Sequence, residues 1–266
     1  EQESAPLITR HSLRETRRKL KLLLAEDNKV NQSLATRLLE KLGHQVTVAN
    51  NGEEAVQQWQ SSRFDAILMD VDMPVMNGYE ATERIRELEQ GTGAHIPVVA
   101  MTAHAMQGAR EECLRHGMDG YLTKPIDTEA LWNELEQIGR AGGPLASRDA
   151  PSLEPTLAVA DFAKARQTMG DNKELFDEIV RLFLEDSPPH IEKIKNGLAQ
   201  GDADAVRHSA HTLKGMVGIF AAERTMQAAE KLESPAGAGG EGMTAALVEL
   251  ETALSELENA LRDYQW

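Results

Sequence analysis

The feature that most constrains this chain is a regular alternation, between residues 20 and 138, of short apolar runs with longer segments of helical period. Such alternation is typical of a parallel sheet covered by helices on both faces. We expect strands over Lys21–Ala25, Gln45–Ala49, Ala66–Met69, Pro97–Ala100 and Gly120–Thr123. We expect helices over Asn28–Leu42, Gly52–Ser61, Gly78–Gln90, Met106–His116 and Thr128–Ile138. The pattern predicts an α/β, flavodoxin-like (βα)5 domain with a five-stranded parallel sheet.

Reactive side chains follow most of these strands. Glu26 and Asp27 come after the first strand, Asp70 ends the third, Thr102 follows the fourth and Lys124 follows the fifth. Because the carboxyl ends of parallel strands meet at one edge, we expect these groups to converge. Adjacent carboxylates repel unless a cation lies between them, and hard oxygen ligands suit Mg²⁺. One carboxylate could then attack phosphorus, while Mg²⁺ and Lys124 neutralise charge on the phosphoryl oxygens and Thr102 donates a hydrogen bond.

Four segments of this half resemble the motifs of response regulator receiver domains, in order and in spacing. They are residues 23–28 (LLAEDN), 67–78 (ILMDVDMPVMNG), 101–103 (MTA) and 121–125 (YLTKP). The resemblance implies that Asp70 is the phosphoacceptor. It also implies a Mg²⁺ site in which Asp27 and Asp70 are side-chain ligands, Glu26 assists, and Asp72 ligates through its backbone carbonyl.

The same resemblance implies a conformational switch. Thr102 and Tyr121 match the pair of residues that reports phosphorylation by moving inward. Their movement is expected to alter the packing of the face formed by the fourth helix, the fifth strand and the fifth helix. The Lys124–Pro125 peptide bond is expected to be cis, as in the family.

Each residue also has a plainer interpretation when it is considered alone. Asp27 could cap the helix that begins near Lys29, because acidic residues often cap helices. Lys124 alone would be an ordinary surface lysine. The Asp70–Val71–Asp72 run also faintly resembles the nucleophile loop of haloacid-dehalogenase phosphatases, but there the loop follows the first strand, whereas here an acidic pair precedes it.

The composition changes after residue 138. Residues 139–156 are rich in Gly, Pro and Ser, which is typical of a flexible linker. We therefore expect an N-terminal linker segment over residues 1–19, the receiver-like domain over 20–138, the linker over 139–156 and a second domain over 157–266. The second domain should be an antiparallel helical bundle, with helices over Asp161–Met169, Lys173–Glu185, Pro189–Gln200, Ala203–Phe220, Ala222–Glu233 and Met243–Tyr264. The Pro188–Pro189 pair is expected to open a new helix.

The helix that begins at Ala203 carries the chemically informative residues of this half. An apolar stripe at spacings of four and three predicts its buried face: Val206, Ala210, Leu213, Val217 and Phe220. The opposite face, expected to meet solvent, holds Arg207, His211, Lys214, Gly215 and Gly218. An exposed imidazole can carry a phosphoryl group as a phosphoramidate, and Lys214 would offset the new charge. Gly215 and Gly218 would give clearance for the rim of another protein, although a flexible stretch is the alternative.

The segment 209–215 (SAHTLKG) is similar to the signature of histidine phosphotransfer (Hpt) domains, and the resemblance covers about residues 157–266. It implies a four-helix bundle with accessory helices, phosphorylation of His211 and no kinase activity of the domain itself. His208 is the competing histidine, one turn earlier and partly on the same face; we expect it to be a neighbour that tunes charge. The other histidines, including His190, lack such surroundings and are expected in surface or loop positions.

The final helix repeats leucine at spacings of three and four: Leu247, Leu250, Leu254, Leu257 and Leu261. The stripe predicts part of the bundle's own core. A coiled-coil dimer seam is the alternative interpretation.

Charge and composition exclude several kinds of protein. Lys and Arg number 28 against 43 Asp and Glu, a net charge of −15, and aromatic residues make up 4%. A nucleic-acid platform is therefore disfavoured. The single cysteine, Cys113, excludes an intrachain disulfide. No apolar run is long enough to span a bilayer, so we expect no direct membrane contact and a cytoplasmic location, as a piece of a larger and possibly membrane-anchored sensor.

A receiver domain followed by an Hpt domain resembles the C-terminal part of a bacterial hybrid sensor histidine kinase. The resemblance implies a relay. An upstream histidine kinase core of the same polypeptide phosphorylates Asp70, His211 receives the group, and the receiver of a downstream response regulator takes it. The sequence shows no ATP-binding motif of a kinase. The alternatives are a phosphorylation-gated inhibitory binding module, and a reverse relay that acts as a phosphate sink.

Overall fold

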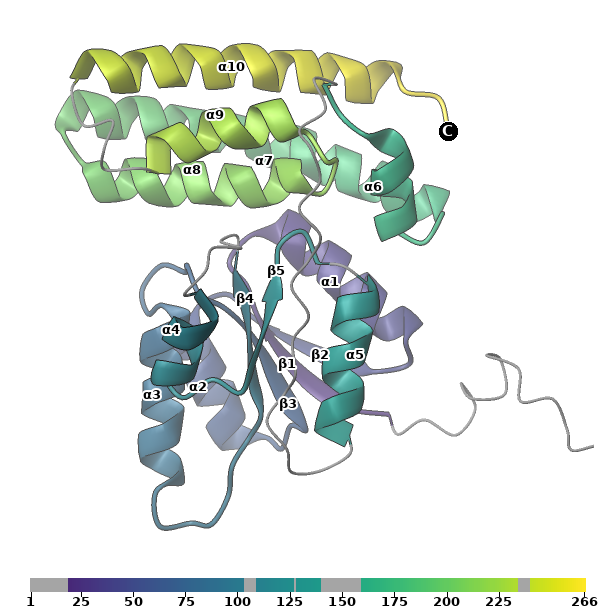
Figure 1. Ribbon diagram of the computed structural model, residues 1–266, viewed down its shortest axis with the longest axis vertical. Helices are drawn as coiled ribbons and strands as arrows, with labels where there is room; N and C mark the ends of the chain where they lie inside the picture. Colours follow the sequence, from purple (N-terminus) through teal and green to yellow (C-terminus); the bar gives the residue numbers. More distant parts are fainter. Residues whose placement is uncertain (1–18, 103–108, 127, 140–158, 234–239) are drawn as a thin grey trace, which may run out of the picture.

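A computed structural model describes residues 19–102, 109–126, 128–139, 159–233 and 240–266. Over these residues the chain forms a sheet domain and a helical bundle (Figure 1). The bundle lies beyond the carboxyl ends of the strands, against the edge at which the reactive side chains were expected. The residues 140–158, which include most of the expected linker, are outside the described part.

The sheet is parallel throughout and has the order β2-β1-β3-β4-β5. Its strands are β1 (Lys21–Ala25), β2 (Gln45–Ala49), β3 (Ala66–Asp70), β4 (Val98–Thr102) and β5 (Gly120–Thr123). The flavodoxin-like class is therefore confirmed. Pairing of Ala25 with Met69 brings the residues that follow β1 beside the end of β3.

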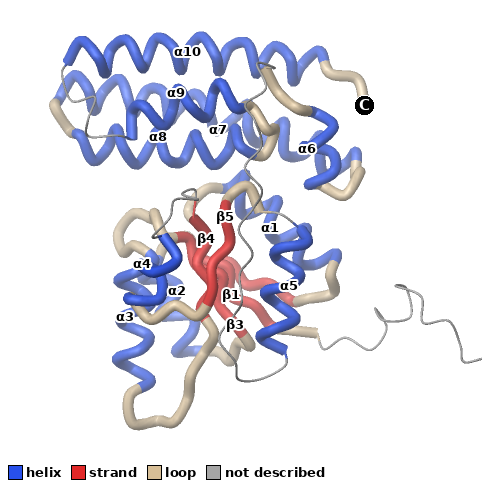
Figure 2. The backbone as a smooth tube through the Cα atoms, viewed as in Figure 1, coloured by secondary structure: helices blue, strands red, loops and turns tan. Residues whose placement is uncertain are grey.

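Helices cover both faces of this sheet (Figure 2). They are α1 (Lys29–Lys41), α2 (Gly52–Ser61), α3 (Gly78–Glu89), α4 (Ala109–Arg115) and α5 (Thr128–Gly139). Successive side chains of a strand point to opposite faces, so Leu22 and Leu24 pack with Leu34 of α1, whereas Leu23 packs with Ile85 of α3. The start of the expected fourth helix, residues 106–108, is outside the described residues.

The turn between β3 and α3 keeps the loop close to Asp70. Asn77 begins α3 with a capping box, in which its side chain accepts from the Glu80 backbone and Glu80 bonds back. A Cβ at Gly78 would collide with the backbone oxygen of Asp70. Glycine is therefore required where the helix starts against the end of the strand.

The second domain is a bundle of α7 (Lys173–Gln200), α8 (Ala203–Gly218), α9 (Glu223–Glu233) and α10 (Gly240–Asp263), with the short α6 (Phe162–Thr168) at one end. The leucine stripe of α10 is buried in the bundle, from Leu250 and Leu257 at 0% exposed to Leu247 at 8%. The stripe is therefore bundle core, and the dimer-seam interpretation is wrong.

One helix boundary was predicted wrongly. Instead of two helices separated at Pro188, the structure has a single helix, α7, with Pro188 and Pro189 inside it. Each interior proline lacks an N–H donor and costs about 3 kcal/mol. The apolar stripe nevertheless continues across the prolines, with Ile179 and Phe183 buried before them and Ile194 buried after them. Burial of both halves against one core offsets the local cost.

The two domains share a continuous apolar core. The cluster that contains Leu34 of α1 also contains Phe176 and Ile179 of α7. Helix α1 therefore lies between the sheet and the bundle, and its side chains pack against both. Among the described helices, none combines the length and apolar character needed to cross a bilayer.

Candidate functional site

Three carboxylates meet at the carboxyl edge of the sheet, as the strand ends predicted. Glu26 and Asp27 follow β1, and Asp70 ends the neighbouring β3. One oxygen from each lies within 4.8 Å of the others. Glu26 and Asp70 are each 1% exposed, so two of the acidic groups are buried side by side.

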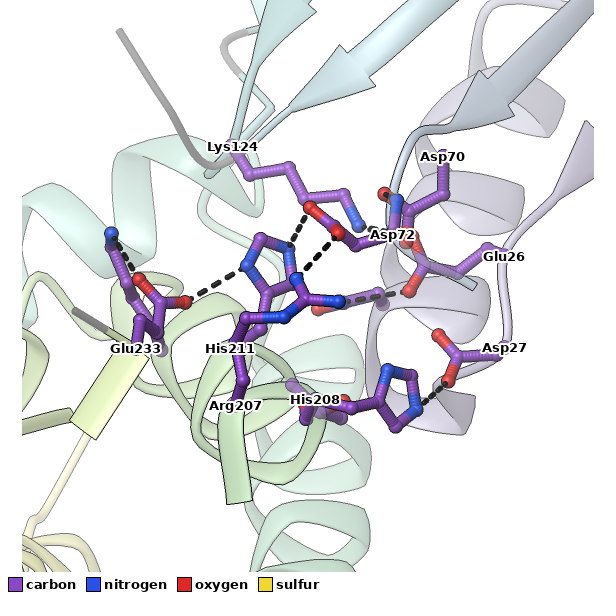
Figure 3. A network of polar contacts seen from close by, with 12 residues as sticks. Glu26, Asp27, Asp70, Asp72, Lys124, Arg207, His208, His211 and Glu233 are labelled. Carbon is purple, nitrogen blue, oxygen red and sulfur yellow. Dashed lines mark hydrogen bonds and ion pairs between the residues drawn. The ribbon is translucent and has the colours of Figure 1, made fainter. Parts of the chain in front are cut away.

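Lys124 closes this pocket from the loop after β5 (Figure 3). Its Nζ lies 2.7 Å from Oε2 of Glu26 and 2.7 Å from Oδ2 of Asp70. The lysine side chain is 6% exposed, so the interpretation as an ordinary surface lysine is wrong. The Lys124–Pro125 bond is cis, as expected.

Thr102 and Tyr121 lie on the two strands beside the pocket. Thr102 ends β4, is 5% exposed, and accepts a 2.7 Å hydrogen bond at its backbone oxygen from the Lys124 N–H. Tyr121 lies in β5, partly buried against the core on the α2–α4 face. Their positions follow the sequence expectation, and their role as a switch pair stays a prediction.

Asn28, rather than Asp27, caps α1. The Asn28 side-chain oxygen accepts hydrogen bonds from the backbone N–H groups of Val30 and Asn31. The interpretation of Asp27 as a helix cap is therefore wrong, and its carboxylate is directed to the rim of the pocket. There Oδ2 of Asp27 lies 3.4 Å from Nε2 of His208.

The pocket has more negative charge than Lys124 balances. Burial, with the nearby charge of Glu26, raises the pKa of Asp70 to about 7 despite the opposing attraction of Lys124. Burial disfavours the Lys124 ammonium, but the charges of Asp70 and Glu26 outweigh this and raise its pKa. Three carboxylates and one ammonium have a formal charge of −2. This donor set of hard oxygens at short mutual distance fits a divalent cation such as Mg²⁺.

His211 faces the pocket and is covered by it, which corrects the expectation of an exposed ring. The residue is 5% exposed, and its Nε2 lies 3.4 Å from Oδ2 of Asp72, in the loop after β3. The helical pattern identified a face without large apolar side chains, but that face meets the sheet domain rather than solvent. The ring is thus withdrawn from water by the domain that carries Asp70.

Glu233, at the end of α9, holds the other side of the imidazole. Its Oε1 lies 2.8 Å from Nδ1 of His211. Burial opposes a charged ring, but Glu233 and the charges of Asp72 and Asp70 outweigh it and raise the pKa of His211. When Nδ1 carries the proton toward Glu233, the lone pair of neutral His211 is on Nε2, which points to the sheet domain.

Lys214 also differs from its predicted environment. It is 5% exposed and forms ion pairs with α9, at 3.1 Å to Glu230 and 2.9 Å to Glu233. These partners, with the hydrogen bond to Glu233 foremost, overcome burial and raise the pKa of Lys214. The cation therefore orients the carboxylate that contacts His211.

Gly215 and Gly218 are likewise buried rather than solvent-facing. A Cβ at Gly215 would lie 3.2 Å from the Asn31 side chain, and one at Gly218 would lie 3.5 Å from Cδ of Pro125. Both glycines therefore give clearance to the sheet domain of the same chain. Clearance for another protein was expected here, whereas the structure shows clearance for the receiver-like domain of the same chain.

Charged side chains at the rim complete the contact (Figure 3). Arg207 of α8 places a guanidinium nitrogen 3.2 Å from Oδ1 of Asp72, while His211 approaches the other oxygen of that carboxylate. His208 pairs with Asp27, and its expected role in tuning charge stays a prediction. The side chain of Asp72 thus faces the bundle, and its backbone role toward a metal stays a prediction.

Sequence reasoning missed several interface residues. Glu233 ends an amphipathic helix without any motif, and Glu178 and Asp186 lie on the polar side of α7. His190 was expected in a surface or loop position, but it is 8% exposed within α7, and its Nε2 lies 3.8 Å from Asp186. These residues are brought to the site by the packing of α7, α8 and α9 against one another and against α1.

Two family models match the chain. Residues 22–136 match the response regulator receiver domain, and residues 178–262 match the Hpt domain. The chain is 32% identical over 244 residues to sensor histidine kinase GacS of Pseudomonas protegens, with 89% of this chain and 26% of that protein covered. It is 29% identical over 255 residues to signal transduction histidine-protein kinase BarA of Escherichia coli, with 94% and 27% covered.

Among solved structures, one similar protein is the receiver domain of sensor histidine kinase PA1611 from Pseudomonas aeruginosa, which has a magnesium ion coordinated in its active-site cleft. It is 44% identical, covers 46% of this chain and 99% of that chain, and has a TM-score of 0.42. This chain spans about a quarter of the length of GacS and BarA.

Proposed function

We propose that this chain, a receiver domain followed by an Hpt domain and a member of the hybrid sensor histidine kinase family, passes a phosphoryl group between Asp70 and His211. Phosphorelay signal transduction is the function that this pair of domains indicates. One observation supports the residue assignment most strongly. The only imidazole of α8 that contacts both Asp72 and Glu233 in the described structure is His211, and it faces the pocket that contains Asp70.

In the first step, a carboxylate oxygen of Asp70 attacks the phosphorus of a phosphohistidine on an upstream kinase core. The O–P bond forms, the P–N bond breaks, and the upstream imidazole leaves. Lys124 contacts Asp70 and would offset charge on the phosphoryl oxygens, and Thr102, at the end of β4, would donate a hydrogen bond to one of them. The product is an acyl phosphate on Asp70.

In the second step, Nε2 of neutral His211 attacks that phosphorus. The P–N bond forms, the P–O bond breaks, and the Asp70 carboxylate is regenerated. The proton on Nδ1 stays within reach of Glu233, 2.8 Å away, and offsets the charge of the phosphorylated ring. Lys214 keeps Glu233 in place. A downstream response regulator then takes the group from His211.

The donor set proposed to hold Mg²⁺ is Glu26, Asp27 and Asp70, with the backbone carbonyl of Asp72. Bound there, the ion would neutralise charge on the transferring phosphoryl oxygens. The reported metal in the PA1611 receiver supports this assignment, as does the excess of buried acid in this pocket. We further propose a cytoplasmic setting, in which the upstream kinase core belongs to the same polypeptide.

The test is to incubate the chain with Mg²⁺ and ³²P-labelled acetyl phosphate, and to separate base-labile aspartyl phosphate from acid-labile phosphohistidine. Label should reach both residues in the unmodified chain and only Asp70 in His211→Gln. Asp70→Asn should leave both unlabelled. His208→Gln is the matched control and should keep the label on His211. Full histidine labelling in Asp70→Asn would refute the serial order.

Reverse flow uses the same contacts, because the ring and the acceptor face one another without a built-in direction. A chain labelled on His211 by a second, phosphorylated copy should then release inorganic phosphate through Asp70. Loss of that release when the labelled chain carries Asp70→Asn would assign the phosphate-sink activity to the same two residues.

A further inference from the structure

The contact between the two domains extends well beyond the reacting groups. On α1 and the residue that caps it, Asn28 donates a 2.8 Å hydrogen bond to Asp186, and Ser33 donates a 3.0 Å bond to Glu178. Arg37 lies 3.4 Å from Glu178. We call this row of contacts between α1 and α7 the polar seam. It lies beside the shared apolar core, in which Leu34 packs in the same cluster as Ile179.

The seam holds the receiver over the face of α8 at which Nε2 of His211 meets Asp72. That nitrogen lies 3.4 Å from Asp72, and Gly215 lies against Asn31. The reacting aspartate of any other receiver would need the same approach to Nε2. Two receivers therefore cannot occupy this face together, because protein interiors are close-packed.

We propose that the polar seam makes the chain's own receiver the preferred occupant of the α7–α8 face, so that a receiver domain of another molecule reaches His211 only after this one undocks. The inference rests on the proposed function, and it adds the identity of the competing partner. Asn28 and Arg37, with their acceptors Asp186 and Glu178, are the residues that determine this preference.

The contacts of the polar seam contribute unequally to the docking of the receiver on the bundle. Asn28 is 3% exposed and donates to a charged acceptor, an interaction that changes an equilibrium constant about tenfold or more. The Arg37 side chain is 55% exposed, and such pairs contribute no more than about fivefold. Asn28→Asp should repel Asp186 while retaining the cap, because aspartate caps helices as well as asparagine does. Arg37→Glu should repel Glu178.

The test uses two copies of the full chain. The donor copy carries His211→Gln and Glu178→Arg, is labelled on Asp70 with ³²P-phosphoramidate and Mg²⁺, and is then freed of reagent. Its own bundle cannot accept the group, and its receiver is less firmly docked. The acceptor copy carries Asp70→Asn, so that label on its His211 must arrive from the donor.

Three acceptors are compared with Mg²⁺ present. An acceptor that also carries Asn28→Asp and Arg37→Glu should gain label about fivefold to tenfold faster than the Asp70→Asn parent, because its own receiver releases the face while Glu178 and Asp186 still accept the donor. An acceptor with Arg181→Glu is the matched control. Arg181 pairs with Glu185 on the exposed side of α7, so its rate should equal that of the parent.

Equal or slower labelling of the acceptor with Asn28→Asp and Arg37→Glu would overturn the inference, as would a failure to label any acceptor while the unmodified chain labels its own His211. The proposed function fails in a different way. If the proposed function is wrong, His211 of the unmodified chain stays unlabelled even when its Asp70 is fully labelled.

Discussion

The carboxylate pocket and the histidine site both bury charged groups, but they do so by different means. The pocket is assembled within one domain, where Glu26, Asp70 and Lys124 come from strand ends that the parallel sheet brings to one edge. The histidine site is covered from outside, by Asp72 of the other domain and by Glu233 of a neighbouring helix. The pocket is thus a property of one fold, whereas the burial of His211 depends on docking.

The largest effect should come from breaking the ion pairs inside the pocket. Lys124→Met leaves Glu26 and Asp70 buried without their cation, and we expect the free energy of unfolding at pH 8 to fall by about 3 kcal/mol. Phosphoryl transfer to His211 should also be lost. Urea denaturation measures the change in the free energy of unfolding. Lys173→Met, which removes an exposed pair with Asp177, is the control and should cost less than about 1 kcal/mol. Equal losses of stability in Lys124→Met and Lys173→Met would contradict a buried pocket.

The charge excess of the pocket should appear as a pH dependence. The folded state raises the pKa of Asp70 from 3.8 to about 7, so it binds the proton more tightly than the unfolded chain and loses stability as pH rises between these values. Without Mg²⁺, Asp70→Asn should therefore be more stable than the unmodified chain by a few kcal/mol at pH 8, and the gain should shrink toward pH 4. Urea midpoints at the two pH values measure it. A gain independent of pH would exclude this cause.

A smaller effect should follow from altering the support of the imidazole. Glu233→Ala removes the acceptor beside Nδ1, and we expect transfer to His211 to slow about tenfold. Glu233→Gln keeps an acceptor oxygen and should slow it less. Both changes should lower the pKa of His211, because the carboxylate helps to raise it. NMR titration of the ring measures this pKa, and unchanged dispersion of the backbone amide signals excludes a general loss of structure as the cause of the slower transfer.

The smallest expected effect is at the rim. Arg207→Ala removes an ion pair with Asp72 in which the arginine side chain is 51% exposed. We expect the rate of Asp70-to-His211 transfer to fall less than about fivefold, and the loss to diminish further at high salt. A loss comparable with that of Lys124→Met would show that the rim, rather than the seam and the apolar core, holds the domains together.

Local patterns were sufficient to predict the sheet domain and its pocket. Short apolar runs and the residues after each run placed Asp70 and Lys124 correctly, because parallel strands align their carboxyl ends whatever the details of packing. The same reasoning failed at Pro188, where a local rule for helix termination competed with burial of Phe183 and Ile194 on the same stripe. Tertiary packing decided that competition.

The environment of His211 shows where such reasoning ends. A helical pattern separates an apolar stripe from the rest of α8, but it does not say whether water or another domain covers the rest. The contact between Asn28 and Asp186 joins residues 158 positions apart, and no periodicity connects them. The sequence by itself determined the two folds and the groups able to react, because these depend on backbone period and side-chain chemistry. The tertiary structure alone decided that the domains dock and that Glu233 and Asp72 enclose the ring, because such contacts depend on the relative placement of bodies that fold separately.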